Sequence, residues 1–245
     1  MASPAHLDWR PWSEVGQAGE MHIAILGGTG PAGSGLAARL ASLGHDVVIG
    51  SRSVERAAET VTAIHAKWPD RSLPIRPAAN EDAANADLVV LATPWDSAAS
   101  TALAVADRLQ GKVLISMANA LARVGTEFQP LVPPRGSVAA HVQASVPGCL
   151  VVAALHHLPA KELGNLAIDV PSDVLICSDH PGATKIAIDL VNQIPGCRPI
   201  DAGSLSNAAA IEAFTAVLLQ LNIRYKTRSA LRLTGIDIPY GPSTQ

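Results

Sequence analysis

The sequence predicts an α/β protein with a doubly wound parallel sheet of the Rossmann type, followed by a second, smaller C-terminal domain. Two observations carry this prediction. Short apolar runs alternate with helix-length segments at spacings of about 25 residues, which is typical of consecutive β-α-β units. The first apolar run also ends in a glycine-rich turn that leads directly into a helix-length segment, as at the start of many such sheets.

Short apolar runs bounded by turn residues are expected to form the strands of this sheet. They are Met21–Leu26, Asp46–Ile49, Leu73–Arg76, Asp87–Ala92, Lys112–Ser116 and Leu150–Leu155. The segments between them are expected to be helices, and Gly44 and Pro69 supply stop signals after the first two. These helices are Pro31–Leu43, Ser53–Trp68, Asp96–Leu109 and Gly136–Ser145. The crossovers between parallel strands should be right-handed.

The alternation loosens after residue 116, where Pro130, Pro133 and Pro134 predict a loop. Further on, the pattern predicts two more strands and two more helices. They are Asp173–Cys177, Arg198–Asp201, Pro181–Gln193 and a long helix from Ser206 to about Tyr225. We therefore divide the chain into an N-terminal extension (1–20), a Rossmann domain (21–157) and a smaller C-terminal domain (158–245).

Composition excludes several classes of function. The formal net charge is −3 and no basic run is present, so no nucleic-acid partner is expected. No apolar stretch is long enough to predict a membrane span, and the first 20 residues carry acidic side chains in place of a secretory signal. Cys149, Cys177 and Cys197 lie far apart without a CxxC pair, which favours reduced thiols and a cytoplasmic location.

The turn after the first strand carries a G-x-G-x-x-G motif, made of Gly28, Thr29, Gly30, Pro31, Ala32 and Gly33. The first glycine would permit the tight turn, Gly30 would let a pyrophosphate approach the backbone, and Gly33 would let the helix pack on the strand. The helix N-terminus then offers free N–H groups to the phosphates. The alternative is a structural glycine-rich turn, but the strand and helix on either side favour dinucleotide binding.

The tip of the second strand decides which dinucleotide is expected. Enzymes that bind NAD carry an acidic residue there for the ribose hydroxyl, whereas this chain has Ser51 and Arg52, with Arg56 one helical turn further on. Guanidinium groups and a hydroxyl suit the 2′-phosphate of NADP. The sequence therefore predicts NADP(H), although the arginines could also be a solvated helix start.

Two further turns follow strands whose carboxyl ends should face the ligand. Thr93, Pro94 and Trp95 follow the fourth strand, and Ala118 and Asn119 follow the fifth. Both turns are expected to line the ribose and nicotinamide, and packing is the alternative for Trp95.

A histidine pair follows the last strand of the predicted sheet, in the run His156-His157-Leu158-Pro159-Ala160. His156 is the candidate catalytic residue, as a proton donor or a substrate contact, with a structural role as the alternative. No metal site is expected, because adjacent histidines point in different directions and no carboxylate or cysteine cluster joins them. Further along, Asp201–Asn207 is typical of a turn with a helix cap, which could also face an anionic ligand.

Taken together and in this order, these motifs resemble the F420-dependent NADP oxidoreductases. The resemblance covers nearly all of residues 21–233. It rests on Leu26–Gly30, Gly44-His45, Gly50-Ser51-Arg52, Thr93-Pro94-Trp95, Ala154–His156 with Leu158–Ala160, and Asp201–Gly203 with Leu205–Asn207. It implies that NADP is held by Thr29, Ser51, Arg52 and Arg56. It also implies that a second group of residues lies near the deazaflavin ring of coenzyme F420. That second group is His156, Pro159, Ala160, Leu205 and Ser206.

The resemblance also implies reversible hydride transfer between NADPH and F420 by a homodimer. The protein would hold the reacting carbons about 3–3.5 Å apart and exclude water, while the two cofactors supply the chemistry. Two alternatives stay open, an NADP-dependent reductase of imines or hydroxy acids and a non-catalytic NADP sensor. The first would need an acid near the substrate, and Lys112 and Lys161 are expected to be peripheral.

Overall fold

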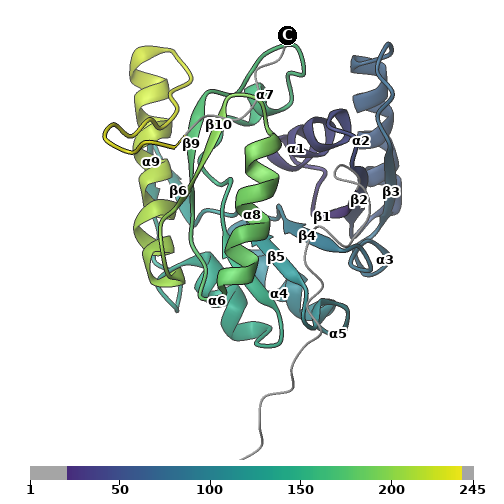
Figure 1. Ribbon diagram of the computed structural model, residues 1–245, viewed down its shortest axis with the longest axis horizontal. Coiled ribbons are helices and arrows are strands. Elements are labelled where there is room, and N and C mark those ends of the chain that lie inside the picture. The colour runs from purple at the N-terminus through teal and green to yellow at the C-terminus, as the bar shows by residue number, and fades with distance from the viewer. Residues whose placement is uncertain (1–20, 239–245) are drawn as a thin grey trace, which may run out of the picture.

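A six-stranded parallel sheet forms the centre of the protein (Figure 1). The computed structural model describes residues 21–238, so the extension 1–20 lies outside the described residues. The strands run in the order β3-β2-β1-β4-β5-β8, and each neighbouring pair is parallel. Their bounds are β1 His22–Leu26, β2 Asp46–Ser51, β3 Ile75–Ala79, β4 Leu88–Leu91, β5 Val113–Ser116 and β8 Leu150–Ala153. The strand order reverses between β1 and β4, which confirms the doubly wound Rossmann-type prediction.

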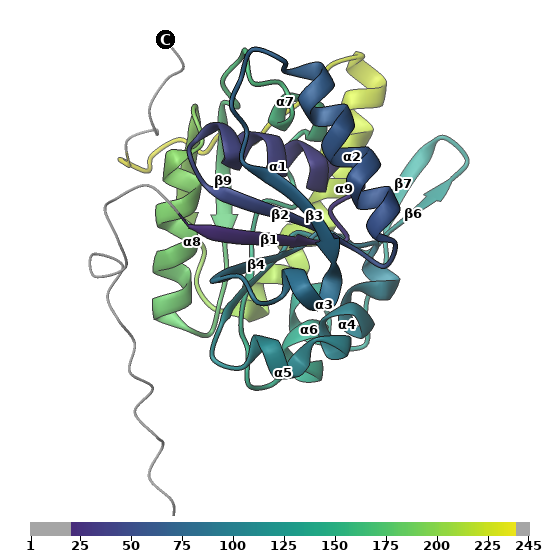
Figure 2. The same cartoon turned by 90° about the vertical axis from the view of Figure 1, so that its right-hand side faces the viewer.

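Helices cover both faces of the sheet. Figure 2 shows α1 (Pro31–Ser42) and α2 (Val54–Lys67) above it, with α4 (Trp95–Ala104), α5 (Ala106–Leu109) and α6 (Val138–Ser145) below. Successive residues of β1 alternate between the two layers: Ile23 and Ile25 belong to one apolar cluster, Ala24 and Leu26 to the other. Burial on both faces explains why these strands are continuous apolar runs in the sequence.

The predicted elements match the observed ones within a few residues, with four differences, one of which is an unpredicted short helix at Ala160–Leu163. The expected helix Asp96–Leu109 is divided into α4 and α5, and a short helix, α3 (Asn80–Ala83), follows β3. Pro133 and Pro134 lie in a loop as predicted, but residues 121–130 before it, for which no element was predicted, hold the antiparallel hairpin of β6 (Leu121–Val124) and β7 (Glu127–Pro130). Its loop begins at Gly125 with φ +62°, which a two-residue hairpin loop favours, and Pro130 falls at the end of its strand, where a missing N–H is tolerated.

The C-terminal part packs against the same core. It comprises α7 (Ala160–Leu163), β9 (Ser172–Ile176), α8 (Pro181–Gln193), β10 (Cys197–Asp201), a 3₁₀ turn at Leu205–Asn207, and α9 (Ala208–Tyr225). β9 and β10 are parallel to each other, and Val174 and Leu190 join the apolar cluster that contains Ile23. The division at residue 158 stays a prediction.

The direction of β9 determines what reaches the carboxyl edge of the main sheet. An antiparallel bridge joins Ala153, the last residue of β8, to Cys177. β9 therefore runs against β8, and its first residues lie beyond the carboxyl end of β8. In agreement, the ring of His157 is hydrogen-bonded to the backbone carbonyl of Asp173 at 2.8 Å.

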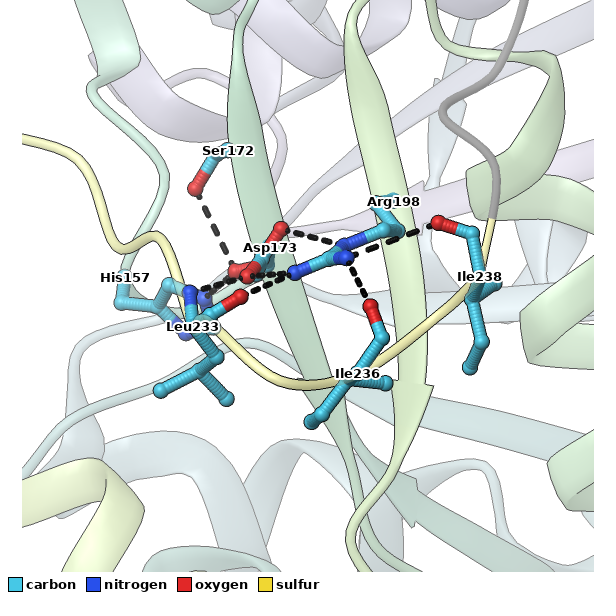
Figure 3. A network of polar contacts seen from close by, with 7 residues as sticks. All are labelled: His157, Ser172, Asp173, Arg198, Leu233, Ile236 and Ile238. Carbon is cyan, nitrogen blue, oxygen red and sulfur yellow. Dashed lines mark hydrogen bonds and ion pairs between the residues drawn. The ribbon is translucent and has the colours of Figure 1, made fainter.

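A buried ion pair holds the C-terminal segment at this edge (Figure 3). Arg198 donates to both carboxylate oxygens of Asp173, at 2.8 and 2.6 Å, and both side chains are almost completely buried. The same guanidinium donates to the carbonyls of Leu233 and Ile236, each at 2.7 Å, and the Leu233 amide donates back to Asp173. The pair thus fixes the path of residues 231–238.

We predict that Arg198→Met lowers the free energy of unfolding by about 3–5 kcal/mol, because it leaves the Asp173 carboxylate buried without its charge partner. Urea denaturation measures the change. The matched control is Lys185→Met, which removes an exposed pair with Asp189 at 2.6 Å and should cost no more than about 0.5 kcal/mol. Equal losses in both variants would contradict the role assigned to Arg198.

Candidate cofactor-binding site

The glycine-rich turn lies between the end of β1 and the start of α1. The left-handed residue of the turn is Gly27, with φ +68°, and not Gly28 as the motif predicted. Gly28 and Gly33 are instead required by close packing: a Cβ on Gly28 would lie 2.8 Å from the Ile25 carbonyl, and one on Gly33 would lie 2.7 Å from the Gly28 Cα. The helix therefore sits directly on the turn, as expected for Gly33.

Gly30 differs from its neighbours because open space surrounds it. No atom lies within 4 Å of the position that a Cβ would occupy there. The residue is the N-cap of α1 and provides no capping side chain, and Pro31 begins the helix. An exposed, uncapped N-terminus with room for a close approach fits a pyrophosphate group.

The tip of β2 leads into α2 through Ser51, Arg52 and Ser53. The Ser51 hydroxyl is buried and accepts a hydrogen bond from the Ser53 amide at 3.2 Å, which leaves its proton free to be donated. Ser53 caps α2 by accepting from the Arg56 amide. The guanidinium groups of Arg52 and Arg56 are exposed and make no ion pair with any residue in 21–238.

The placement of these two arginines is electrostatically unfavourable for the helix itself. Cations near a helix N-terminus oppose the macrodipole, and Glu55 is the acidic residue of that first turn. Its carboxylate is hydrogen-bonded to the Ser53 hydroxyl at 2.8 Å. An anion bound between Arg52 and Arg56 would relieve the repulsion, so the tip of β2 fits a 2′-phosphate.

Buried polar atoms without a protein partner gather at the carboxyl ends of three neighbouring strands. They are the hydroxyl of Thr93 after β4, the hydroxyl of Ser116 at the end of β5, and both ring nitrogens of His156 after β8. Buried polar groups are usually paired, so ligand atoms with hydrogen-bonding edges fit here. The sequence analysis missed Ser116, although a polar residue ending an apolar run was a signal for it.

The turn that carries His156 has an unusual backbone. Leu155 is buried and adopts φ +67°, a conformation that costs free energy for a non-glycine residue and occurs most often at functional sites. Burial, and to a lesser extent the neighbouring His157, lowers the pKa of His156 to about 3. The imidazole is therefore neutral at physiological pH.

Asn119 supports this turn from the neighbouring strand end. Its side-chain amide donates to the His156 carbonyl at 2.7 Å, and its oxygen accepts from the Thr215 hydroxyl of α9 at 3.2 Å. Both ends of the amide are thus engaged within the protein. Its predicted cofactor contact stays a prediction, and the positions of Ala118 (buried), Pro94 (the N-cap of α4) and Trp95 (half-buried) agree with a location at this edge.

The structure brings Pro159 and Ala160 to the same edge but not Leu205 and Ser206. Pro159 is the N-cap of α7, directly after the histidine turn. Leu205 follows β10, whose direction places it beyond the far end of β9, and its amide donates to Asp179. α9 then runs from Ala208 back to Thr215 beside Asn119, a distance of roughly 10 Å along the helix. Within one chain, Leu205 and Ser206 are therefore remote from His156.

The C-terminal segment lies next to the histidine turn. The Leu231 carbonyl accepts from the Asp173 amide at 2.8 Å, next to the histidine turn. Arg228 lies 3.8 Å from the Glu162 carboxylate of α7. Because buried charges require partners, the burial of Asp173 and Arg198 accounts for this arrangement.

Comparison with known proteins identifies the family to which the chain belongs. Residues 22–120 match the family described as "NADP oxidoreductase coenzyme F420-dependent". The chain is 39% identical over 224 residues to the F420-dependent NADP reductase of Methanocaldococcus jannaschii, which covers 89% of this chain and 100% of that protein. The chain belongs to this family.

Other members of the F420-dependent NADP reductase family agree. The enzyme of Methanothermobacter thermautotrophicus (strain Delta H) is 35% identical over 88% of this chain and 96% of its own length. A crystal structure of a putative F420-dependent NADP reductase from Arthrobacter sp. FB24 has a TM-score of 0.74 at 27% identity, covering 87% of this chain and 100% of that one. Among residues 21–238, no helix combines the length and apolar character that a membrane span requires.

The glycine turn yields a paired prediction. Gly30→Ala should leave the melting temperature unchanged and weaken NADPH binding by roughly tenfold or more, because the methyl group enters the open space above the turn. Gly33→Ala should instead destabilise the fold by about 1–3 kcal/mol, because its methyl group meets the Gly28 backbone. Thermal unfolding and NADPH titration of both variants measure this, and a folding defect in Gly30→Ala would contradict it.

Proposed function

We propose that this protein transfers a hydride reversibly between NADPH and the 5-deazaflavin coenzyme F420. The observation that carries the proposal is the 39% identity to an F420-dependent NADP reductase over that protein's whole length. The carboxyl edge of the sheet supports it, because the turn fitted for a dinucleotide and the neutral histidine turn open onto the same edge. An imine reductase or a non-catalytic sensor is not favoured.

On this proposal NADP(H) lies across the carboxyl ends of β1, β2 and β4. Thr29, Gly30 and the N-terminus of α1 hold the pyrophosphate, and Ser51, Arg52 and Arg56 hold the 2′-phosphate. Thr93, Pro94, Trp95 and Ala118 line the ribose and nicotinamide.

The deazaflavin ring is assigned to the histidine turn. The two cofactors supply the chemistry, a hydride passing between the nicotinamide and the deazaflavin with a proton exchanged with solvent. His156, Pro159 and Ala160 hold the ring and exclude water. Because the His156 imidazole is neutral, it can donate one hydrogen bond and accept another, and it orients the ring rather than serving as an acid.

A homodimer and a cytoplasmic location complete the proposal. The outward face of α9 exposes Phe214, Val217 and Leu221 at helical spacing, which suits contact with a second copy. Cys149, Cys177 and Cys197 are buried free thiols, as a reducing compartment favours.

Mixing the purified protein with NADPH and oxidised F420 tests the activity directly. We expect loss of the deazaflavin's visible absorbance, and NADH should support it at least roughly a hundredfold less well, since two charge-assisted hydrogen bonds to the 2′-phosphate are at stake. Failure to bleach authentic F420 would refute the proposed function.

Variants at the tip of β2 separate the cofactor assignment from the activity. Arg52→Gln and Arg56→Gln should each raise KM for NADPH by about tenfold while leaving the reaction with NADH unchanged. Arg76→Gln is the matched control, because this exposed arginine lies on neighbouring β3 and faces Asp46 at 3.8 Å. Equal losses with NADPH and NADH would remove the argument for the 2′-phosphate.

His156→Ala should reduce F420 binding or turnover by about tenfold and spare NADPH affinity, since one neutral hydrogen bond and a packed ring contribute on the order of 1–2 kcal/mol. Its effect on turnover should not vary between pH 5 and 8, because the folded pKa is near 3. Unfolded histidine titrates near 6.5 and binds the proton more readily, so His156 contributes stability that is lost as pH falls below about 6.5. A collapse of NADPH affinity in His156→Ala would overturn the assignment.

A further inference from the structure

A cationic groove lies between α1, α2 and α7, next to the carboxyl edge of the sheet. It encloses about 660 Å³. One wall is a face of α1 that includes Pro31 and Ala38, and the second is a face of α2 that ends at Lys67. The third is formed by α7, the residues that follow it, and Arg228 from the C-terminal segment.

The groove carries an excess of positive charge. Lys67 donates to the Gly164 carbonyl at 2.9 Å and lies 5.3 Å from the centre of the Trp68 ring. Lys161 is exposed on α7 and forms no hydrogen bond or ion pair with residues 21–238. Arg228 faces Glu162 at 3.8 Å, the one ion pair at the groove among the described residues. Three cations therefore stand against one carboxylate.

The groove is continuous with the site already described. Pro31 is the first residue of α1 and follows Gly30, while Ala160 directly follows Pro159 on the histidine turn. From Pro31 to Ala38 the α1 wall is roughly 10 Å long, which is the length of about three extended amino-acid residues. A ligand whose ring contacts the histidine turn can therefore lay a chain of that length in the groove.

The groove has a rigid floor. A Cβ on Gly164 would lie 3.0 Å from the Gly35 Cα, and one on Gly35 would lie 2.9 Å from the Ala160 carbonyl. The backbones of α1 and α7 thus touch, and Arg39 beneath them donates to four carbonyls of residues 162–168. This shape is fixed before any ligand binds, which lowers the entropic cost of binding.

We propose that this groove binds the anionic side chain of the deazaflavin coenzyme, the phosphodiester and the carboxylates attached to it, through Lys161 and Arg228. The assignment rests on the proposed function and extends it to the part of F420 that takes no part in hydride transfer. A chain of negative charges complements Lys161, which has no ion pair with residues 21–238, and Arg228, whose pair with Glu162 is long. The pyrophosphate and the 2′-phosphate of NADP are already assigned to Gly30 and to the tip of β2.

The test compares F420 with the same deazaflavin lacking the phosphodiester chain (7,8-didemethyl-8-hydroxy-5-deazariboflavin). Fluorescence titration of the full-length protein gives the Kd of each, and steady-state kinetics give KM and kcat. Lys161→Gln combined with Arg228→Gln should raise Kd and KM for F420 about tenfold, as expected for two partly exposed ion pairs, and leave the chain-less deazaflavin and NADPH unchanged. Lys185→Gln on α8 is the matched control and should change nothing.

Each other outcome has a definite meaning. If the double variant weakens both deazaflavins equally or neither, the groove does not hold the chain and the inference is wrong. If only NADPH binding weakens, the groove belongs to the dinucleotide, which also overturns it. If the wild-type protein reduces neither deazaflavin, the proposed function itself fails. If it reduces both, but the double variant does not weaken F420 more than the chain-less deazaflavin, only the groove assignment is wrong.

Discussion

The buried guanidinium of Arg39 joins the two halves of the candidate site. Arg39 lies on the inner part of α1 and is 1% exposed. Its nitrogens donate to the backbone carbonyls of Glu162, Leu163, Asn165 and Ile168, the carbonyls at and after the end of α7. A helix C-terminus leaves such carbonyls unsatisfied and carries partial negative charge, so a cation stabilises it. α7 is thereby held against α1, and the histidine turn is held near the glycine turn.

Arg198, a second buried arginine, helps to hold the histidine turn in place from its other side. Arg198 pairs with Asp173 and reaches the carbonyls of the C-terminal segment, while the Asp173 carbonyl accepts from His157 (Figure 3). His157 packs edge-on against His156 with ring centres 5.2 Å apart. The position of His156 therefore depends on backbone and charge contacts on both sides, although its own ring nitrogens have no hydrogen-bond partner among the described residues.

The sequence was sufficient for the fold because the main sheet is determined by local patterns. Strands such as β4 and β5 are apolar runs of the right length, and helices such as α8 (Pro181–Gln193) begin at a proline and were predicted to the residue. The site was predicted where it follows strand ends directly, as at Gly28–Gly33, Ser51 and His156. The assignment of Leu205 and Ser206 to the site stays a prediction. Within one chain these residues follow β10, and their location depends on the direction of β9, which no local pattern encodes.

The burial of Arg39 and Arg198 could not be predicted from the sequence, for a related reason. Arg39 lies in an amphipathic helix, where an arginine is normally exposed, and only the arrival of α7 more than 120 positions later buries it. Arg228 and Lys161 likewise become neighbours of one groove only after the C-terminal segment is anchored by Arg198. Contacts of this range depend on tertiary packing and not on periodicity.

The same contacts explain how the protein can keep polar atoms unpaired at a buried edge. Each unsatisfied buried donor or acceptor costs on the order of 1–3 kcal/mol, and Thr93, Ser116 and His156 all carry such atoms. The apolar clusters on both sides of the sheet and the two arginine networks stabilise the fold through other groups, so the unpaired atoms of Thr93, Ser116 and His156 stay available to a ligand. A ligand that pairs with those atoms recovers the cost only in the folded protein, and by mass action its binding then stabilises the fold. Binding and stability are therefore coupled at the carboxyl edge.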